Sequence, residues 1–206
     1  MSDSPFQSEH FAREDESPDP HFYGPPRHVA HIDDEARTAL TRQMDDILPN
    51  GGDVLDLMAS YYSHLPDRRF RSVIGLGLNA EELSKNAQLS AGVVHDVNER
   101  PDLPFRDDSF DACILTVSIQ YATRPIELFG SVRRILRSGG VFMVAYANRM
   151  FPTKAIALWR AISMADRGRL VQIYCQEAGG FRDIQAKALS SKGDDEIHAV
   201  TAWKAA

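Results

Sequence analysis

The sequence contains few cysteines, no long apolar run and little excess charge. With 2 cysteines in 206 residues, no disulfide framework holds the fold, and a reducing compartment, the cytoplasm, is predicted. Its apolar runs are far shorter than a membrane-spanning helix requires, and residues 1–20 lack the basic and then apolar pattern of a signal peptide. A net charge of −6 argues against a general nucleic-acid binder. We therefore expect a small-molecule substrate and neither a nucleic-acid nor a membrane partner, while the oligomeric state is left open.

Most of the negative charge lies at one end of the chain. Residues 1–20 contain six acidic residues and one Arg, a net charge of −5, which leaves −1 for the rest. Because this stretch has little apolar content beyond Phe6 and Phe11, a disordered acidic tail is predicted over residues 1–20. A short N-terminal segment over residues 21–33 then leads into a domain over residues 34–206.

Predicted helices and strands alternate beyond residue 33. Helices are expected over 34–48, from Asn79 onward, over 125–136, and over 153–177 with a break near 166–168. Strands are expected over 53–57, 72–76, 92–95, 111–117, 141–145, 181–189 and 197–203. This alternation indicates an α/β fold with a mostly parallel sheet covered on both faces, and the last two strands indicate a hairpin at one edge. Ligands of such sheets bind at the carboxyl ends of the strands.

The most specific motif surrounds the fourth predicted strand. Residues 103–115 read LPFRDDSFDACIL, residues 134–140 read RILRSGG, and residues 54–57 read VLDL. These stretches resemble the class I S-adenosylmethionine-dependent methyltransferases, in particular their small-molecule branch. The resemblance covers about residues 34–206. It implies a Rossmann-like three-layer sandwich with a mostly parallel seven-stranded sheet and an antiparallel last strand.

The donor-binding turn departs from the pattern of that family. The family follows its first strand with a glycine-rich turn, G-x-G-x-G, whereas Met58, Ser60 and Tyr62 stand at these positions here. Gly77 stands where the family has the acid that accepts the ribose hydroxyls, and Asp96 matches the acid that meets the adenine amino group. The resemblance thus implies S-adenosylmethionine as cofactor and a degenerate donor motif. The implied cofactor-binding residues are Asp56, Met58, Ser60, Gly77, Asp96 and Val97.

Residues 23–33, the turn MASYYSHLP and residues 147–149 also look like a methyltransferase-like subgroup of bacteria and plants that shares the altered turn. Tyr and His side chains near the donor site are suited to orient or deprotonate an acceptor. The candidate catalytic residues are therefore His31, Tyr61, His64 and Tyr121. The candidates for binding the substrate are Arg27, Gln120, Asn148 and Arg149. The guanidinium group of Arg149 is suited to bind an anionic group through two parallel hydrogen bonds. No metal site is predicted.

Two hypotheses about function follow. In the first, the chain is an S-adenosylmethionine-dependent small-molecule methyltransferase with an altered donor-binding turn. In the second, it is a non-methylating binding module or an enzyme of another reaction type on the methyltransferase scaffold, because fold alone does not determine function. The G-x-G-x-x-A pattern over residues 75–80 is a weaker indication of an NAD-binding Rossmann protein, since the strand over 53–57 already precedes it.

Overall fold

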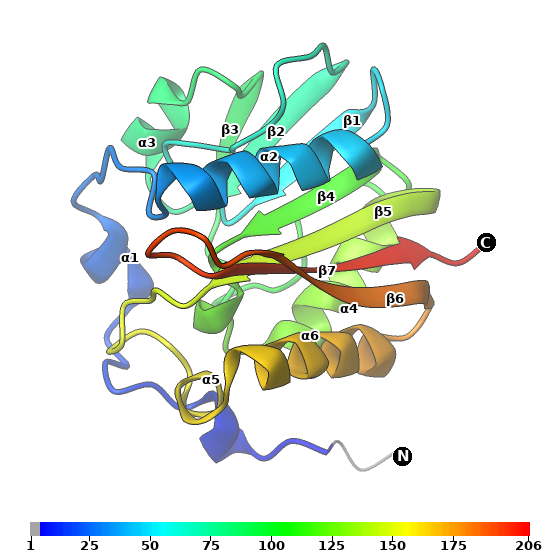
Figure 1. Ribbon diagram of the computed structural model, residues 1–206. Coiled ribbons are helices and arrows are strands. Elements are labelled where there is room, and N and C mark those ends of the chain that lie inside the picture. Colours follow the sequence, from blue (N-terminus) through cyan, green and yellow to red (C-terminus); the bar gives the residue numbers. More distant parts are fainter. Residues whose placement is uncertain (1–4) are drawn as a thin grey trace.

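A seven-stranded sheet forms the centre of the molecule, and helices cover both of its faces (Figure 1). The computed structural model describes residues 5–206. The strand order is β3-β2-β1-β4-β5-β7-β6, and β7 runs antiparallel to both of its neighbours. The predicted α/β class and the antiparallel last strand are thereby confirmed. The strands are β1 (Asp53–Leu57), β2 (Ser72–Gly77), β3 (Ala91–Val94), β4 (Phe110–Thr116), β5 (Leu136–Ala147), β6 (Phe181–Ser190) and β7 (Ile197–Lys204).

Local capping signals determine where several helices begin. The side chain of Asp33 accepts a hydrogen bond from the backbone N–H of Ala36, and the side chain of Asn79 caps the next helix in the same way. The 3-10 helices are η1 (Ser8–Phe11) and η2 (Ile119–Tyr121). The α-helices are α1 (Asp19–Tyr23), α2 (Asp34–Ile47), α3 (Ala80–Lys85), α4 (Pro125–Ile135), α5 (Ala157–Ala161) and α6 (Met164–Ala178). None of the helices within residues 5–206 is long and apolar enough to cross a membrane.

The helical region after β5 differs from the prediction. Residues 153–156 are not helical, and the break between helices lies at Ile162 and Ser163 rather than near residues 166–168. Ser163 starts α6 because its side chain accepts a hydrogen bond from the backbone N–H of Asp166. The glycine that suggested a break, Gly168, is buried inside α6.

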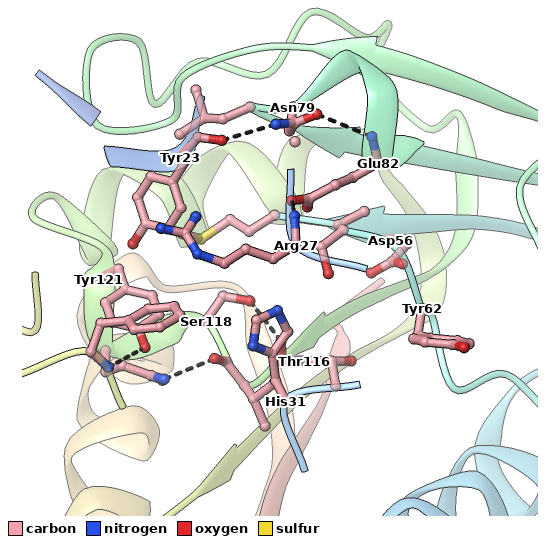
Figure 2. A pocket seen from close by; sticks show the side chains of 18 of the residues that line it. Tyr23, Arg27, His31, Asp56, Tyr62, Asn79, Glu82, Thr116, Ser118 and Tyr121 are labelled. Atoms are coloured by element: carbon pink, nitrogen blue, oxygen red, sulfur yellow. Dashed lines mark hydrogen bonds between the residues drawn. The ribbon is translucent and has the colours of Figure 1, made fainter. Parts of the chain in front are cut away.

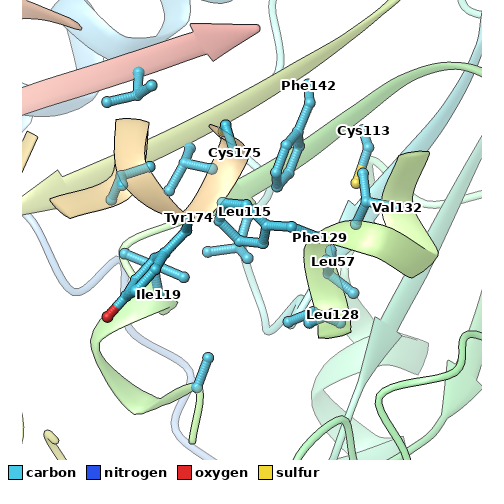
Figure 3. Packing of buried hydrophobic residues seen from close by; sticks show 14 of the residues in the cluster. Leu57, Cys113, Leu115, Ile119, Leu128, Phe129, Val132, Phe142, Tyr174 and Cys175 are labelled. Carbon is cyan, nitrogen blue, oxygen red and sulfur yellow. The ribbon is translucent and has the colours of Figure 1, made fainter. Parts of the chain in front are cut away.

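Two apolar clusters hold the three layers together. On one face of the sheet, α4 and α6 pack onto the strands, and the rings of Phe129 and Phe142 meet edge to face at a centroid distance of 4.8 Å (Figure 3). On the other face, α2 places Ala36, Leu40 and Met44 against the strands. Because both faces are covered, the carboxyl edge of the sheet is where the fold leaves room for a ligand.

The N-terminal segment packs against the domain instead of forming the predicted tail. Residues 1–4 of that tail lie outside the described residues. Over residues 5–20, Phe6 and Phe11 lie against the ring of Tyr174, at centroid distances of 5.3 and 6.3 Å. The fully buried ammonium group of Lys154 lies 3.2 Å from an Asp15 carboxylate oxygen and 3.3 Å from one of Asp19. The acids that suggested disorder thus neutralise a buried cation, since a buried charge requires a partner.

Candidate functional site

A cavity of about 550 Å³ lies at the carboxyl ends of β1, β2, β3 and β4 (Figure 2). Residues that end or follow these strands form one wall, and the segment from Asp19 to Asp33 forms the opposite wall. This is the edge at which parallel sheets bind ligands, and the volume falls within the usual range for small-molecule and cofactor sites.

Most of the predicted site residues meet in this cavity. Among the predicted site residues, those that line the cavity are Arg27, His31, Asp56, Met58, Ser60, His64, Gly77, Asp96, Val97, Gln120, Tyr121 and Arg149. Tyr61 and Asn148 are not among the lining residues. The ring of Tyr61 packs between His28 and Tyr62, and the amide of Asn148 donates to the backbone carbonyl of Asp194 at 3.2 Å. The lining residues are thus close enough to form one site, whereas Tyr61 and Asn148 lie outside it.

The turn after β1 lines the cavity without filling it, and it explains the glycine at the end of β2. The backbone N–H of Ala59 donates to the carbonyl of Leu76 at 2.8 Å, which holds the turn against β2. A Cβ atom on Gly77 would overlap the carbonyl oxygen of Ala59. The altered turn and the absence of an acid at position 77 are therefore two consequences of one backbone arrangement.

Backbone strain is concentrated around the cavity. Four residues other than glycine that line it have positive φ angles: His31 (64°), Met58 (57°), His64 (57°) and Val117 (47°). The conformation is unfavourable for side chains in general and most of all for a β-branched residue such as Val117. Such strain persists where the surrounding structure enforces it, and it clusters at functional sites.

Four buried polar atoms beside the cavity have no hydrogen-bond partner within the described residues: Tyr23 Oη, Asp56 Oδ2, Thr116 Oγ1 and Gln120 Oε1. Asp56 is the next-to-last residue of β1 and is 2% exposed, and desolvation raises the pKa of its carboxyl to about 7 despite a hydrogen bond with Ser63. Because unsatisfied buried polar atoms are costly, these four atoms mark where polar groups of a ligand fit.

The raised pKa of Asp56 predicts a specific dependence of stability on pH. Between about pH 4 and 7 the folded state keeps a proton that the unfolded state, with a pKa near 3.8, has lost. Stability therefore falls as the pH rises through this window. Asp56→Asn cannot ionise, so its free energy of unfolding relative to the native sequence should rise by roughly 2 kcal/mol between pH 5 and 7.

Urea denaturation of both proteins at several pH values measures this difference. His64 has a folded-state pKa lowered to about 4 and contributes the opposite slope, gaining stability as the pH rises from 4 to 6.5. The difference between the two proteins cancels that contribution, because His64 is present in both. A difference that stays constant from pH 5 to 7 would contradict the assignment.

His31 and His64 are neutral bases at physiological pH. Burial lowers the pKa of His64 to about 4, and burial together with the charge of Arg27 lowers the pKa of His31. Tyr121 behaves differently, because burial raises the pKa of its phenol and its oxygen accepts from the backbone N–H of Phe151 at 2.8 Å. The cavity thus offers imidazoles that can accept a proton and a tyrosine that keeps its own.

Arg149 lies in the cavity wall, but a carboxylate already binds it. Its Nε donates to Asp195, which is fully buried. Asp195 also accepts from the backbone N–H of Asp33 at 2.7 Å, and Asp33 accepts from the backbone N–H of Asp195 at 3.0 Å. A substrate anion at Arg149 would compete with this pair, which weakens the prediction that Arg149 binds an anionic group.

Glu82 is a cavity residue that the sequence analysis missed. It lies on α3, is 7% exposed, and its Oε1 accepts from the backbone N–H of Arg27 at 2.6 Å (Figure 2). Its other carboxylate oxygen has no hydrogen-bond partner within residues 5–206. Its place in the cavity depends on how α3 packs and on the contact with Arg27, which is 55 residues away in the sequence.

Comparisons with known proteins agree with this arrangement. Residues 57–144 match the model of a family described as a methyltransferase domain. The biotin biosynthesis bifunctional protein BioHC of Teredinibacter turnerae is 31% identical over 75 residues, 34% of this chain and 13% of that protein. The ubiquinone/menaquinone biosynthesis C-methyltransferase UbiE of Paracoccus denitrificans is 30% identical over 124 residues, 53% of this chain and 48% of that protein. The chain spans less than half the length of the curated relatives it matches.

Solved structures share the fold at low sequence identity. The [4+2]-cyclase SpnF has a TM-score of 0.61 at 16% identity, over 81% of this chain and 80% of that one. The geranyl diphosphate C-methyltransferase of Streptomyces coelicolor, in complex with S-adenosyl-L-homocysteine, has a TM-score of 0.58 at 14% identity, over 81% and 77%. Taken with the strand order, these likenesses show that the chain has the Rossmann-like fold of S-adenosylmethionine-dependent methyltransferases, and residues 57–144 are similar to a methyltransferase domain.

Proposed function

We propose that the protein is an S-adenosylmethionine-dependent methyltransferase that acts on a small molecule and binds its donor with an altered turn. The observation that carries this proposal is the cavity at the carboxyl edge, where the turn leaves about 550 Å³ free. Four buried polar atoms beside it have no partner within the described residues, on Tyr23, Asp56, Thr116 and Gln120. A site that had lost its ligand would be expected to close around such atoms, because native interiors are well packed and pair their polar groups.

Three carboxylates are suited to hold the donor. Asp96 uses Oδ1 to accept from the backbone N–H groups of Asn98 (2.9 Å) and Glu99 (3.3 Å), which leaves Oδ2 for the adenine amino group that the family resemblance assigns to it. Glu82, with one unused oxygen, is suited to the ribose hydroxyls that Gly77 cannot bind. Asp56 is suited to the ammonium group at the methionine end.

The donor supplies a methyl group for in-line displacement, so the chain contributes mainly positioning and proton transfer. The N-terminal segment closes one side of the cavity, with the side-chain amide of Asn79 donating to the backbone carbonyls of Tyr23 (3.0 Å) and Gly24 (2.8 Å). His31, a neutral imidazole in the wall, is the candidate to accept a proton from the nucleophile of the acceptor.

Calorimetric titration with S-adenosylhomocysteine, with NADH in parallel, tests the proposal. We expect saturable binding of S-adenosylhomocysteine and none of NADH. The non-methylating alternative draws on the altered turn and on the likeness to a cyclase structure. Absence of any heat or thermal shift with S-adenosylhomocysteine would favour that alternative, and saturable binding of NADH alone would favour the dinucleotide interpretation.

The role given to Glu82 predicts a selective loss of affinity. Glu82→Gln keeps the oxygen that accepts from the backbone of Arg27 but removes the charge, so S-adenosylhomocysteine should bind about tenfold more weakly. Glu81→Gln is the matched control, because Glu81 is half-exposed on the same helix and pairs with Lys85 at 2.7 Å. Equal affinities for the two variants would contradict the assignment.

A further inference from the structure

The guanidinium group of Arg27 faces the cavity without a carboxylate partner in the described part of the chain. Its Nη2 donates to the backbone carbonyl of Phe22 at 2.9 Å, and its other nitrogens form no hydrogen bond within residues 5–206. The other arginine in the wall, Arg149, is paired with Asp195. The guanidinium group of Arg27 therefore forms no ion pair with a carboxylate within residues 5–206.

Aromatic rings and a backbone contact fix the position of this group. The guanidinium carbon lies 4.8 Å from the ring centroid of Phe22, 5.2 Å from that of Phe151 and 5.9 Å from that of Tyr23. The backbone N–H of Arg27 donates to Glu82, and Figure 2 shows the side chain extending from there toward Tyr23. Cation–π contacts of this kind hold an arginine in place while its N–H donors remain free.

The acidic groups nearby are already engaged. Asp19 accepts from Arg13 and Asn98, each at 2.7 Å, and lies close to the ammonium group of Lys154. Asp33 accepts backbone N–H groups of Ala36 and Asp195. Glu82 accepts from the backbone N–H of Arg27 and forms no ion pair with its guanidinium group within residues 5–206, so an anionic group of a ligand would meet a preorganised cation without an ion-pair partner.

The surroundings of the guanidinium group suit a flat apolar body. The rings of Tyr121 and Phe151 stack at a centroid distance of 5.9 Å and an angle of 28°, and the ring of Tyr23 meets Tyr121 at 6.2 Å. Val97 and Met150 also line the cavity. A cation bordered by rings and aliphatic side chains matches a small molecule with an anionic head and an aromatic or apolar remainder.

We infer that Arg27 binds the anionic group, a carboxylate or a phosphate, of a small aromatic or apolar substrate. The inference rests on the proposed function only in treating that molecule as the methyl acceptor. The guanidinium group forms the charge-assisted hydrogen bonds, and the rings of Tyr121 and Phe151 contact the body of the molecule. His31, on the same wall, then lies beside the bound acceptor as its proton acceptor.

Titrations followed by ligand-observed NMR, with and without S-adenosylhomocysteine, test the inference. Benzoate and phenyl phosphate distinguish the two kinds of anion, and benzamide is the uncharged match for benzoate. We expect at least one anion to bind about tenfold or more tightly than benzamide. Arg27→Gln should remove this preference and leave benzamide binding unchanged. Arg37→Gln is the control, because Arg37 also lies over a tyrosine ring, that of Tyr62, but does not line the cavity.

If neither benzoate nor phenyl phosphate binds more tightly than benzamide, or if the preference is unaltered in Arg27→Gln that retains the native melting temperature, the inference is overturned. A second comparison addresses the carboxylate of the donor itself. If Arg27→Gln weakens binding of S-adenosylhomocysteine but not of 5′-methylthioadenosine, which lacks the amino acid, then Arg27 holds the donor and the inference is wrong. Failure of S-adenosylhomocysteine to bind the native protein would contradict only the proposed function, because the anion titrations are also run without it.

Discussion

Gly77→Asp is expected to destabilise the protein by roughly 3 kcal/mol or more and not to restore a ribose-binding acid. Any side chain at this position begins with a Cβ atom that would overlap the carbonyl oxygen of Ala59. That oxygen belongs to backbone, and the neighbouring N–H of Ala59 is bonded to Leu76 at 2.8 Å, so the turn cannot move without losing a hydrogen bond. An acid at position 77 is therefore incompatible with the altered turn.

Urea denaturation of Gly77→Asp and Gly77→Ala measures the effect. The alanine variant separates the clash of the Cβ atom from the charge of the carboxylate, and we expect it to account for most of the loss. Gly130→Ala is the control, because a Cβ atom on Gly130 meets no atom within 4 Å and the residue lies inside α4. There alanine should stabilise by up to about 1 kcal/mol. A Gly77→Ala variant as stable as the native protein would contradict the packing argument.

Lys154→Met is expected to lower the free energy of unfolding by about 3–5 kcal/mol, the cost of removing one partner from a buried ionic cluster. The ammonium group is fully buried, donates to the backbone carbonyl of Ser17 at 2.7 Å and lies near Asp15 and Asp19. Without the ammonium group, the buried carboxylate of Asp19 keeps only one of its two cationic partners, Arg13. The segment that forms one cavity wall should then detach.

Chemical denaturation gives the loss of stability, and limited proteolysis locates it. We expect cleavage within residues 5–33 to be faster in Lys154→Met, together with weaker binding of S-adenosylhomocysteine. The control is Lys187→Met, since Lys187 is exposed and its ammonium group donates to the side chain of Gln43 at 2.9 Å. Unchanged cleavage of the N-terminal segment in a destabilised Lys154→Met would show that the lysine supports the core and not that segment.

Local interactions made the helices and strands predictable. Asp33 and Asn79 cap their helices through backbone groups two or three residues away. Apolar residues at helical spacing, among them Leu40 and Met44, form the buried face of α2. The cavity residues were predictable for a topological reason. Asp56 lies near the end of β1 and Asp96 follows β3, and the carboxyl ends of parallel strands meet at one edge whatever the details of packing.

Contacts between residues distant in the sequence were not predictable from it. The composition of residues 1–20 indicates disorder, yet this segment binds Lys154. Lys154 lies 137 residues beyond Ser17, and the sequence of neither stretch predicts the contact. The same holds for Arg149, which is bound by Asp195, and for Glu82, whose place in the cavity depends on how α3 packs. Charge counts describe a segment in isolation, whereas burial and pairing depend on what folds against it.

The sequence by itself determined the sheet, its antiparallel last strand and the edge at which the cavity lies, because these follow from hydrophobic periodicity and chain connectivity. It also showed that the donor turn lacks its glycines and that position 77 lacks its acid. Only the tertiary structure decided that these two departures are one feature, since the backbone of Ala59 lies where a side chain on Gly77 would be. The acidic N-terminal segment became a wall of the cavity for the same physical reason, a contact between groups far apart in the chain.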